Sequence, residues 1–187
     1  MRKKKLRVGI AGYGVVGKRR RFFIDQHPNM QTVAVCDIKF KKSETMTDGA
    51  KCFQNYHQLL KTHIDVLFVC SPNYLAPEVT IAGLKQNIHV FCEKPPGRTV
   101  KDIEQVINVE KQHPGLLLKY GFNHRYHESV QDALKLIKTG ELGEIINMRG
   151  VYGKSKIVQF SGCWRAERKY AGGGILLDQG IHIVDLM

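Results

Sequence analysis

Several features of other protein classes are missing from this chain of 187 residues. No apolar run approaches the ~20 residues that a membrane-spanning helix needs. Behind the basic N-terminus comes a short segment broken by glycines, residues 8–17, without the apolar core and cleavage site of a signal peptide. Internal repeats and low-complexity tracts are absent as well. We therefore expect a cytoplasmic protein with no membrane partner.

Cysteine pairs at metal-binding spacing are also missing. The five cysteines form no C-x-x-C pair and their number is odd, which argues against a zinc knuckle and a disulfide framework. Cys36, Cys70 and Cys92 each lie near the end of an apolar run, where a free cysteine serves as a small buried hydrophobic side chain. We expect free thiols in a reducing compartment and no metal site.

Acidic residues are absent before Asp25, although nine lysines and arginines precede it. Together with the net charge of +12, this raises the hypothesis of nucleic-acid binding. Nucleic-acid surfaces usually interleave aromatic side chains or supply a recognition helix, and the sequence offers neither. Solvated surface charge explains the excess better. We expect no nucleic-acid partner, with binding through the basic N-terminal third as an alternative.

Apolar runs and helical patterns alternate regularly up to about residue 120. The predicted strands, separated by three predicted helices, cover residues 6–11, 32–36, 64–70, 89–92 and 116–120, and the helices cover residues 15–26, 77–86 and 100–112. Strands that are apolar on both faces and separated by helices are typical of a parallel sheet covered on both sides. The fold class is therefore α/β, with a Rossmann doubly wound parallel sheet.

The pattern changes after Gly121. We expect a helix over residues 128–138, a strand over residues 144–152 and a helix over residues 175–187. These elements cannot close a sheet-based domain, because a lone strand leaves its backbone groups unpaired. We therefore divide the chain into a Rossmann domain at residues 1–122 and an incomplete, C-terminally truncated second α/β domain with an open sheet at residues 123–187.

A G-x-G-x-x-G sequence lies directly between the first predicted strand and the first helix. Gly12 permits the tight turn, Gly14 lets the backbone approach a pyrophosphate, and Gly17 lets the helix pack closely on the sheet. The free N–H groups at the start of the helix, at Val15 and Val16, and the positive end of the helix dipole then bind the phosphates. This context predicts a dinucleotide-binding site.

Further candidate residues follow the predicted strands. Asp37 closes the second strand, 20 residues after Gly17, where its carboxylate accepts hydrogen bonds from ribose hydroxyls and favours NAD over NADP. Nearby lysines leave NADP possible. The third and fourth strands are followed by polar segments that we expect at the nicotinamide end of the same crevice, namely Ser71, Pro72 and Asn73, and Glu93 and Lys94.

The glycine run near the C-terminus carries a second polar pair. If this segment is helical, Asp178 and His182 share one face, and the carboxylate can hold the imidazole and raise its basicity for work as a general base. Asp185 could do the same from the other side. An ordinary contact on a helix surface is the alternative. Lys94 can polarise a substrate oxygen, or be a surface lysine.

Together these segments resemble the glucose–fructose oxidoreductase/inositol dehydrogenase family, written Gfo/Idh/MocA. The segments that carry the resemblance are GIAGYGVVG, VCD, FVCSPN, VFCEKP, YGFNHRY, LGEI and WRAERKYAGGGILLDQGIHIVDL. The resemblance implies that Lys94, Asp178 and His182 form the catalytic group. It also implies hydride transfer between NAD(P) and a hydroxyl carbon of a sugar, polyol or nucleotide-sugar, and a homo-oligomeric full-length form. A non-catalytic NAD(H)-binding remnant or regulatory module is the alternative.

Overall fold

The computed structural model describes residues 4–153 and 163–187. A seven-stranded sheet with the strand order β3-β4-β2-β1-β5-β6-β7 forms its centre. Every neighbouring pair is parallel except β3 and β4. The strands are β1 (Leu6–Ala11), β2 (Met30–Cys36), β3 (Glu44–Thr45), β4 (Lys51–Phe53), β5 (Val66–Val69), β6 (His89–Cys92) and β7 (Leu118–Tyr120). The predicted α/β fold with a doubly wound sheet is confirmed.

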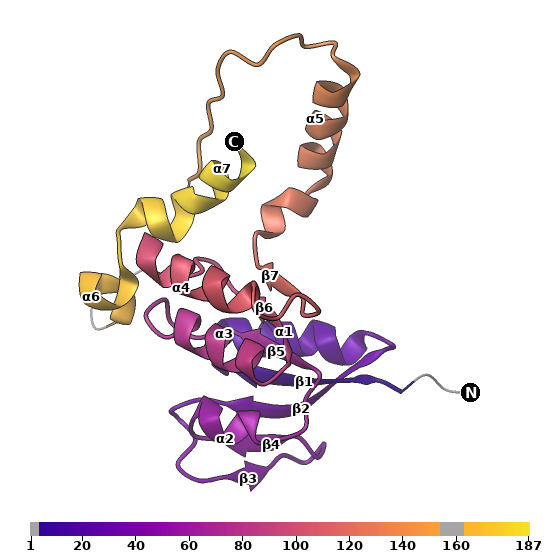
Figure 1. Cartoon of the computed structure of the whole chain (residues 1–187), viewed down its shortest axis with the longest axis vertical. Coiled ribbons are helices and arrows are strands. Elements are labelled where there is room, and N and C mark those ends of the chain that lie inside the picture. The colour runs from indigo at the N-terminus through magenta and orange to yellow at the C-terminus, as the bar shows by residue number, and fades with distance from the viewer. Residues whose placement is uncertain (1–3, 154–162) are drawn as a thin grey trace.

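Helices cover both faces of the sheet (Figure 1). On one face α1 (Val15–Gln26) packs Ile24 against a small core that includes Ile10 and Val35. The larger core on the other face receives side chains from α2 (Tyr56–Leu60), α3 (Ala76–Lys85) and α4 (Val100–Glu110). Alternate residues of β1 and β2 belong to different cores, as the two-residue period of a strand requires.

The direction in which strands are added to the sheet reverses at β1, which lies between β2 and β5. The chain passes through α1 to β2 on one side of β1 and later returns to β5 on the other. In doubly wound sheets this reversal opens a crevice at the carboxyl ends of the central strands, where ligands bind. The crevice therefore lies beside the glycine turn after β1 and the polar segment after β5.

The chain leaves the sheet through η1 (Asn123–Tyr126) and α5 (Glu128–Thr139), and α5 projects away from it (Figure 1). Gly140, in the left-handed region at φ 78°, ends α5. The strand predicted at residues 144–152 is wrong: these residues are exposed and have no regular secondary structure. A strand is stable only with a neighbour for its backbone groups, and none lies beside this segment in the described ranges.

The C-terminal segment returns to the carboxyl edge of the sheet. It contains η2 (Trp164–Ala166), α6 (Arg168–Ala171), the π-helical turn η3 (Leu176–Gly180) and α7 (Ile181–Leu186). The predicted C-terminal helix is thus confirmed over residues 176–186. Within the described residues, no helix combines the length and the apolar character needed to cross a bilayer.

All five cysteines are free. Cys36 and Cys92 are buried, as expected, and burial raises the pKa of each thiol to about 12. Cys70 is only partly buried, although desolvation raises its pKa as well. None of these three thiols is therefore ionised at neutral pH.

Candidate cofactor and catalytic site

The three glycines of the fingerprint occupy different surroundings. A Cβ on Gly12, which has φ +94°, would lie 2.5 Å from the carbonyl oxygen of Cys70, and one on Gly17 would lie 2.1 Å from that of Gly12. Both positions therefore require glycine for the packing of the chain itself. A Cβ on Gly14 would meet nothing within 4 Å. The space beside Gly14 is open, as the approach of a pyrophosphate requires.

A cavity of about 460 Å³ lies at this edge of the sheet. Ten of the residues that we expected to bind the cofactor line it: Gly12, Gly14, Val15, Val16, Asp37, Ser71, Pro72, Asn73, Glu93 and Lys94. Gly17 lies beneath the loop and not in the wall. The start of α1 has no side-chain cap, and Asp37 follows β2 at the same edge. The donors, the open glycine and the carboxylate suit a dinucleotide.

Three of the polar side chains in the wall are held by hydrogen bonds. Ser71 donates through Oγ to the carbonyl of Ala11 over 3.2 Å. Buried Asn73 donates through Nδ2 to the carbonyl of Ala171 over 2.8 Å, and thereby ties the sheet to the C-terminal segment. Asp37 accepts a hydrogen bond at Oδ1 from the backbone N–H of Lys39 over 3.1 Å.

Glu93 is held by an ion pair that the sequence analysis missed. Arg20 of α1 donates through Nε to Glu93 Oε1 over 2.5 Å, and its guanidinium lies 5.0 Å from the centre of the Phe91 ring. Arg20 belongs to a run of four basic residues that we interpreted as surface charge. Arg20 is next to Arg21, which is buried together with Gly17 and Ile24 on the face of α1 that packs against the sheet. This position on the helix was the signal that the basic run is not only surface charge.

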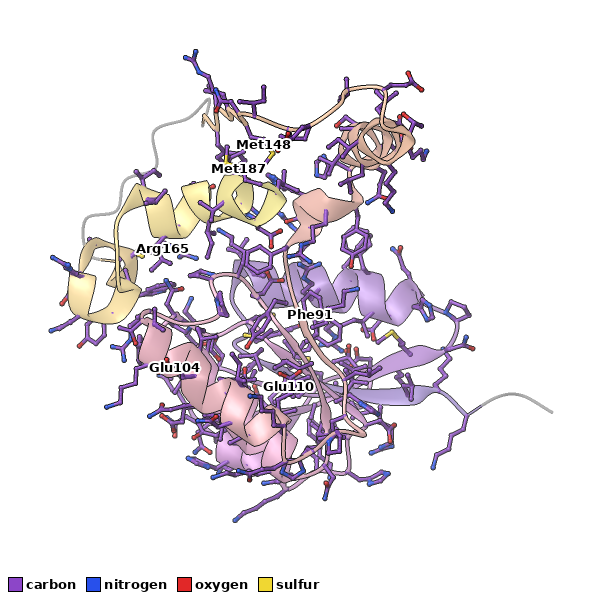
Figure 2. All side chains as sticks on the ribbon, turned by 45° about the horizontal axis from the view of Figure 1, so that its top comes forward. Phe91, Glu104, Glu110, Met148, Arg165 and Met187 are labelled. Carbon is purple, nitrogen blue, oxygen red and sulfur yellow. The ribbon has the colours of Figure 1, made fainter. Side chains whose placement is uncertain are left out.

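Lys94 and Asp178, 84 residues apart in the chain, meet at the cavity wall. Lys94 Nζ donates to the carbonyl oxygen of Asp178 and lies 3.7 Å from its Oδ1. Arg165 Nε lies 4.0 Å from the same carboxylate oxygen, and Figure 2 shows Arg165 on the C-terminal segment. The Asp178 carboxylate thus faces two cations.

His182 lies behind this wall, with 4% of its surface exposed, and is not among the lining residues. Burial, followed by the nearby charges of Lys94 and His124, lowers its pKa from 6.5 to about 4. As we expected, the Asp178 carboxylate acts to raise this pKa, but its effect is the smallest of the causes, and burial with the charges of Lys94 and His124 outweighs it. Nδ1 is buried and has no hydrogen-bond partner in the described residues.

Asp185 has a different partner from the one that we considered. It receives two hydrogen bonds from Arg125, over 2.8 and 2.5 Å, while its own side chain is 7% exposed. This pair links α7 to η1.

Cavity residues that the sequence did not lead us to assign to the cofactor are Cys70, Pro95, Cys163, Trp164, Arg165 and Gln179. Cys70, Pro95 and Cys163 come from connecting segments, whereas Trp164 and Arg165 belong to η2 and Gln179 belongs to η3.

The chain belongs to the Gfo/Idh/MocA oxidoreductase family. The family model described as "Oxidoreductase family, NAD-binding Rossmann fold" matches residues 6–122, and the "GFO/IDH/MocA C-terminal domain" matches residues 130–187. The first match alone covers more than half of the chain. The resemblance inferred from the sequence motifs is thereby confirmed.

Individual relatives are sugar and polyol dehydrogenases. D-glucoside 3-dehydrogenase of Escherichia coli is 30% identical over 99% of this chain and 54% of its own length. The structure of myo-inositol 2-dehydrogenase from Lactobacillus plantarum is similar with a TM-score of 0.78 and 30% identity, over 98% of this chain and 55% of that one.

Scyllo-inositol dehydrogenase from Lactobacillus casei, whose structure contains NAD(H) and scyllo-inositol, is 25% identical with a TM-score of 0.67. That similarity covers 75% of this chain and 43% of that one. The chain spans about half the length of the curated relatives it matches, from 45% to 54% of the first relatives.

Proposed function

We propose that this chain binds NAD and takes part in the oxidation of a hydroxyl group on a sugar, polyol or nucleotide-sugar. The observation that carries the proposal is the meeting of Lys94 and Asp178 beside the glycine loop, with His182 directly behind them. A cation, a carboxylate and an imidazole at a dinucleotide crevice are the groups that a dehydrogenase of this kind needs.

The residues that hold the cofactor in this proposal come from two ends of the cavity. The N–H groups at the start of α1, with Gly14, Val15 and Val16, bind the pyrophosphate, and Asp37 accepts hydrogen bonds from the adenosine ribose. Ser71, Pro72, Asn73 and Glu93 lie toward the nicotinamide end. The carboxylate of Asp37 repels a 2′-phosphate, and we propose NAD rather than NADP for that reason.

The chemistry is divided between three side chains. Bound NAD⁺ supplies the hydride acceptor. His182 is neutral at pH 7, with a pKa lowered to about 4 by burial, by Lys94 and by the charge of His124 when that residue is protonated, so it can accept the proton of the substrate hydroxyl. Nδ1 of His182 is buried and has no hydrogen-bond partner within the described residues. Because buried polar atoms are normally hydrogen-bonded, this nitrogen is suited to a hydrogen bond with a bound ligand. Lys94 donates a hydrogen bond to the same oxygen as negative charge develops there, and Asp178 holds Lys94.

The division into domains is part of the proposal. Residues 1–122 form the cofactor-binding domain, and residues 123–187 contribute the start of the domain that binds substrate. The carbohydrate substrate class is supported by relatives that act on glucosides and inositols. In this arrangement the substrate lies between the sheet and the C-terminal segment, where Lys94 and Asp178 face each other.

Calorimetry on the 187-residue chain tests the cofactor part of the proposal. We expect NADH to bind to the wild type, and Gly14→Val to lose about 100-fold in affinity, because the branched side chain fills the open space beside the helix start. Gly115→Val is the matched control, since a Cβ there also meets nothing within 4 Å and Gly115 does not line the cavity. No binding, or equal affinity in both variants, would overturn the proposal.

Turnover tests the chemical part. The natural gene product is assayed for NAD reduction with a panel of polyols, uronates and nucleotide-sugars, alongside its Lys94→Met and His182→Gln variants. We expect turnover by the wild type and a loss of at least about 100-fold in kcat in each variant. Cofactor binding that is unchanged in both variants, with no turnover by any form, would instead establish a non-catalytic NAD(H)-binding module.

A further inference from the structure

Three histidines lie together where η1 meets the C-terminal helix. The rings of His124 and His182 are stacked, with centroids 4.1 Å apart and an interplanar angle of 12°. The ring of His127 lies 5.0 Å from that of His124, at an interplanar angle of 57°. His182 is buried, His124 is half-buried and His127 is exposed, so exposure increases from His182 through His124 to His127.

Two other rings complete the surroundings of His182. Phe122 presents its edge at 6.3 Å and 88°, and Tyr152 lies 5.9 Å away at 29°, while Tyr152 also lies 5.3 Å from His124. The closest and most nearly parallel of these contacts is that of His124. The plane of the His182 ring is therefore set mainly by His124.

The charged groups around the stacked pair come from segments that are far apart in the chain. Lys94, in the segment after β6, acts on both rings, as does Asp185 of α7. Asp178 acts on His182, and His127 acts on His124. Arg125 of η1 is bound to Asp185, which reduces the negative charge that this carboxylate presents to the histidines. The surroundings of the pair thus disfavour a second positive charge.

We propose that His124 is a positioning residue for His182: its stacked ring fixes the plane of the buried imidazole, shields it from water and keeps it in the neutral form. This inference deepens the proposed function and rests on it only for the role of His182 as a base. Its physical basis is that two stacked imidazoles cannot both be protonated without strong repulsion.

The order of protonation follows from the same contacts. The pKa of His124 is lowered by burial, by His127 and by Lys94, and that of His182 is lowered further, to about 4. As the pH falls, His124 therefore takes up a proton first, and its charge then opposes protonation of His182. The buried imidazole stays available as a proton acceptor over a wider range of pH than an isolated histidine.

Histidine titration by NMR on the 187-residue chain tests this proposal without substrate. The His124→Phe variant keeps a stacked ring and removes the charge, and we expect the pKa of His182 to rise by about one unit. His63→Phe, at an exposed position before the amino end of β5, is the matched control and leaves the His182 titration unchanged. The His182 signal is assigned by its loss in His182→Gln.

A His182 titration that moves no more in His124→Phe than in the control overturns the proposal. If His124→Phe fails to fold, His124→Gln is measured in the same way, and there too an unchanged pKa overturns it. Absence of dehydrogenase activity would contradict the proposed function and leave the titration readable, so the two failures are distinguishable. In an active enzyme, the acid limb of kcat/KM moves to higher pH in His124→Phe by the same amount.

Discussion

Acidification should destabilise the fold through one buried imidazole. The pKa of His182 is about 4 in the folded chain and 6.5 for the unperturbed side chain, which approximates the unfolded state. Between these two values the unfolded state binds more protons than the folded one, so the free energy of unfolding decreases as the pH falls through this window. The contribution is fully present above pH 6.5 and lost below about pH 4.

The size of the effect follows from the shift. At about 1.4 kcal/mol per pKa unit, the difference corresponds to about 3 kcal/mol, a large part of the 5–15 kcal/mol that is typical of a folded domain. Part of this shift depends on the charge of His124, so the histidine pair titrates together. We therefore expect His182 to account for about 2–3 kcal/mol of the loss between pH 6.5 and pH 4.

Urea unfolding followed by circular dichroism measures this loss at several pH values. The free energy of unfolding of His182→Gln should depend less steeply on pH than that of the wild type over the window, even though the variant starts lower at pH 7 through lost packing. His63→Gln, which changes an exposed histidine, should keep the wild-type slope. Equal slopes for the wild type and His182→Gln would refute the assignment of a lowered pKa to His182.

Three further substitutions separate packing from binding. Gly17→Ala should cost about 2–4 kcal/mol in the free energy of unfolding, because its Cβ would lie 2.1 Å from a backbone oxygen; a loss below about 0.5 kcal/mol would contradict this. Asp37→Ser should reduce NADH affinity about tenfold and bring NADPH affinity closer to it, measured by calorimetry. Asn73→Ala removes the donor to the carbonyl of Ala171 and should lower the free energy of unfolding by about 1–3 kcal/mol. Hydrogen exchange in the C-terminal segment should become faster. Unchanged exchange would contradict the role of this hydrogen bond in holding the segment.

The elements that were predictable from the sequence are those with a strong local pattern. β1, α1 and β6 have the predicted bounds, since each is a complete apolar run or a full amphipathic helix with a glycine or a polar residue at its boundary. β4 was missed because a strand of three residues with one fully buried side chain, Cys52, has no detectable period. The strand expected at residues 144–152 was wrong although its local pattern suits a sheet. A strand also needs a neighbouring strand for its backbone groups, and the local pattern does not show whether one is there.

In the candidate site, too, the residues with a local sequence pattern were predictable and the contacts between distant segments were not. The glycine loop and Asp37 were predictable because their geometry follows from one βαβ unit. The contact of Lys94 with Asp178 joins segments 84 residues apart, and only the resemblance to a family suggested it. The partner of Glu93 and the ring stacked on His182 escaped prediction, since Arg20 and His124 meet them only after the chain has folded.

The C-terminal segment lines part of the candidate cofactor cavity and carries two members of the proposed catalytic group, Asp178 and His182. One side of the cavity comes from the glycine loop and the ends of β2 and β5, and the other includes Trp164, Arg165 and Gln179. Besides the Lys94 and Asn73 contacts, Arg98 donates through Nη1 to the carbonyl of Lys169 over 2.6 Å at this junction. A ligand that contacts both sides binds only when the segment is docked, and by linkage it must stabilise the docked state by the same free energy. We therefore expect cofactor binding to be coupled to the docking of the C-terminal segment, which the polar contacts of Lys94, Asn73 and Arg98 hold at the carboxyl edge of the sheet.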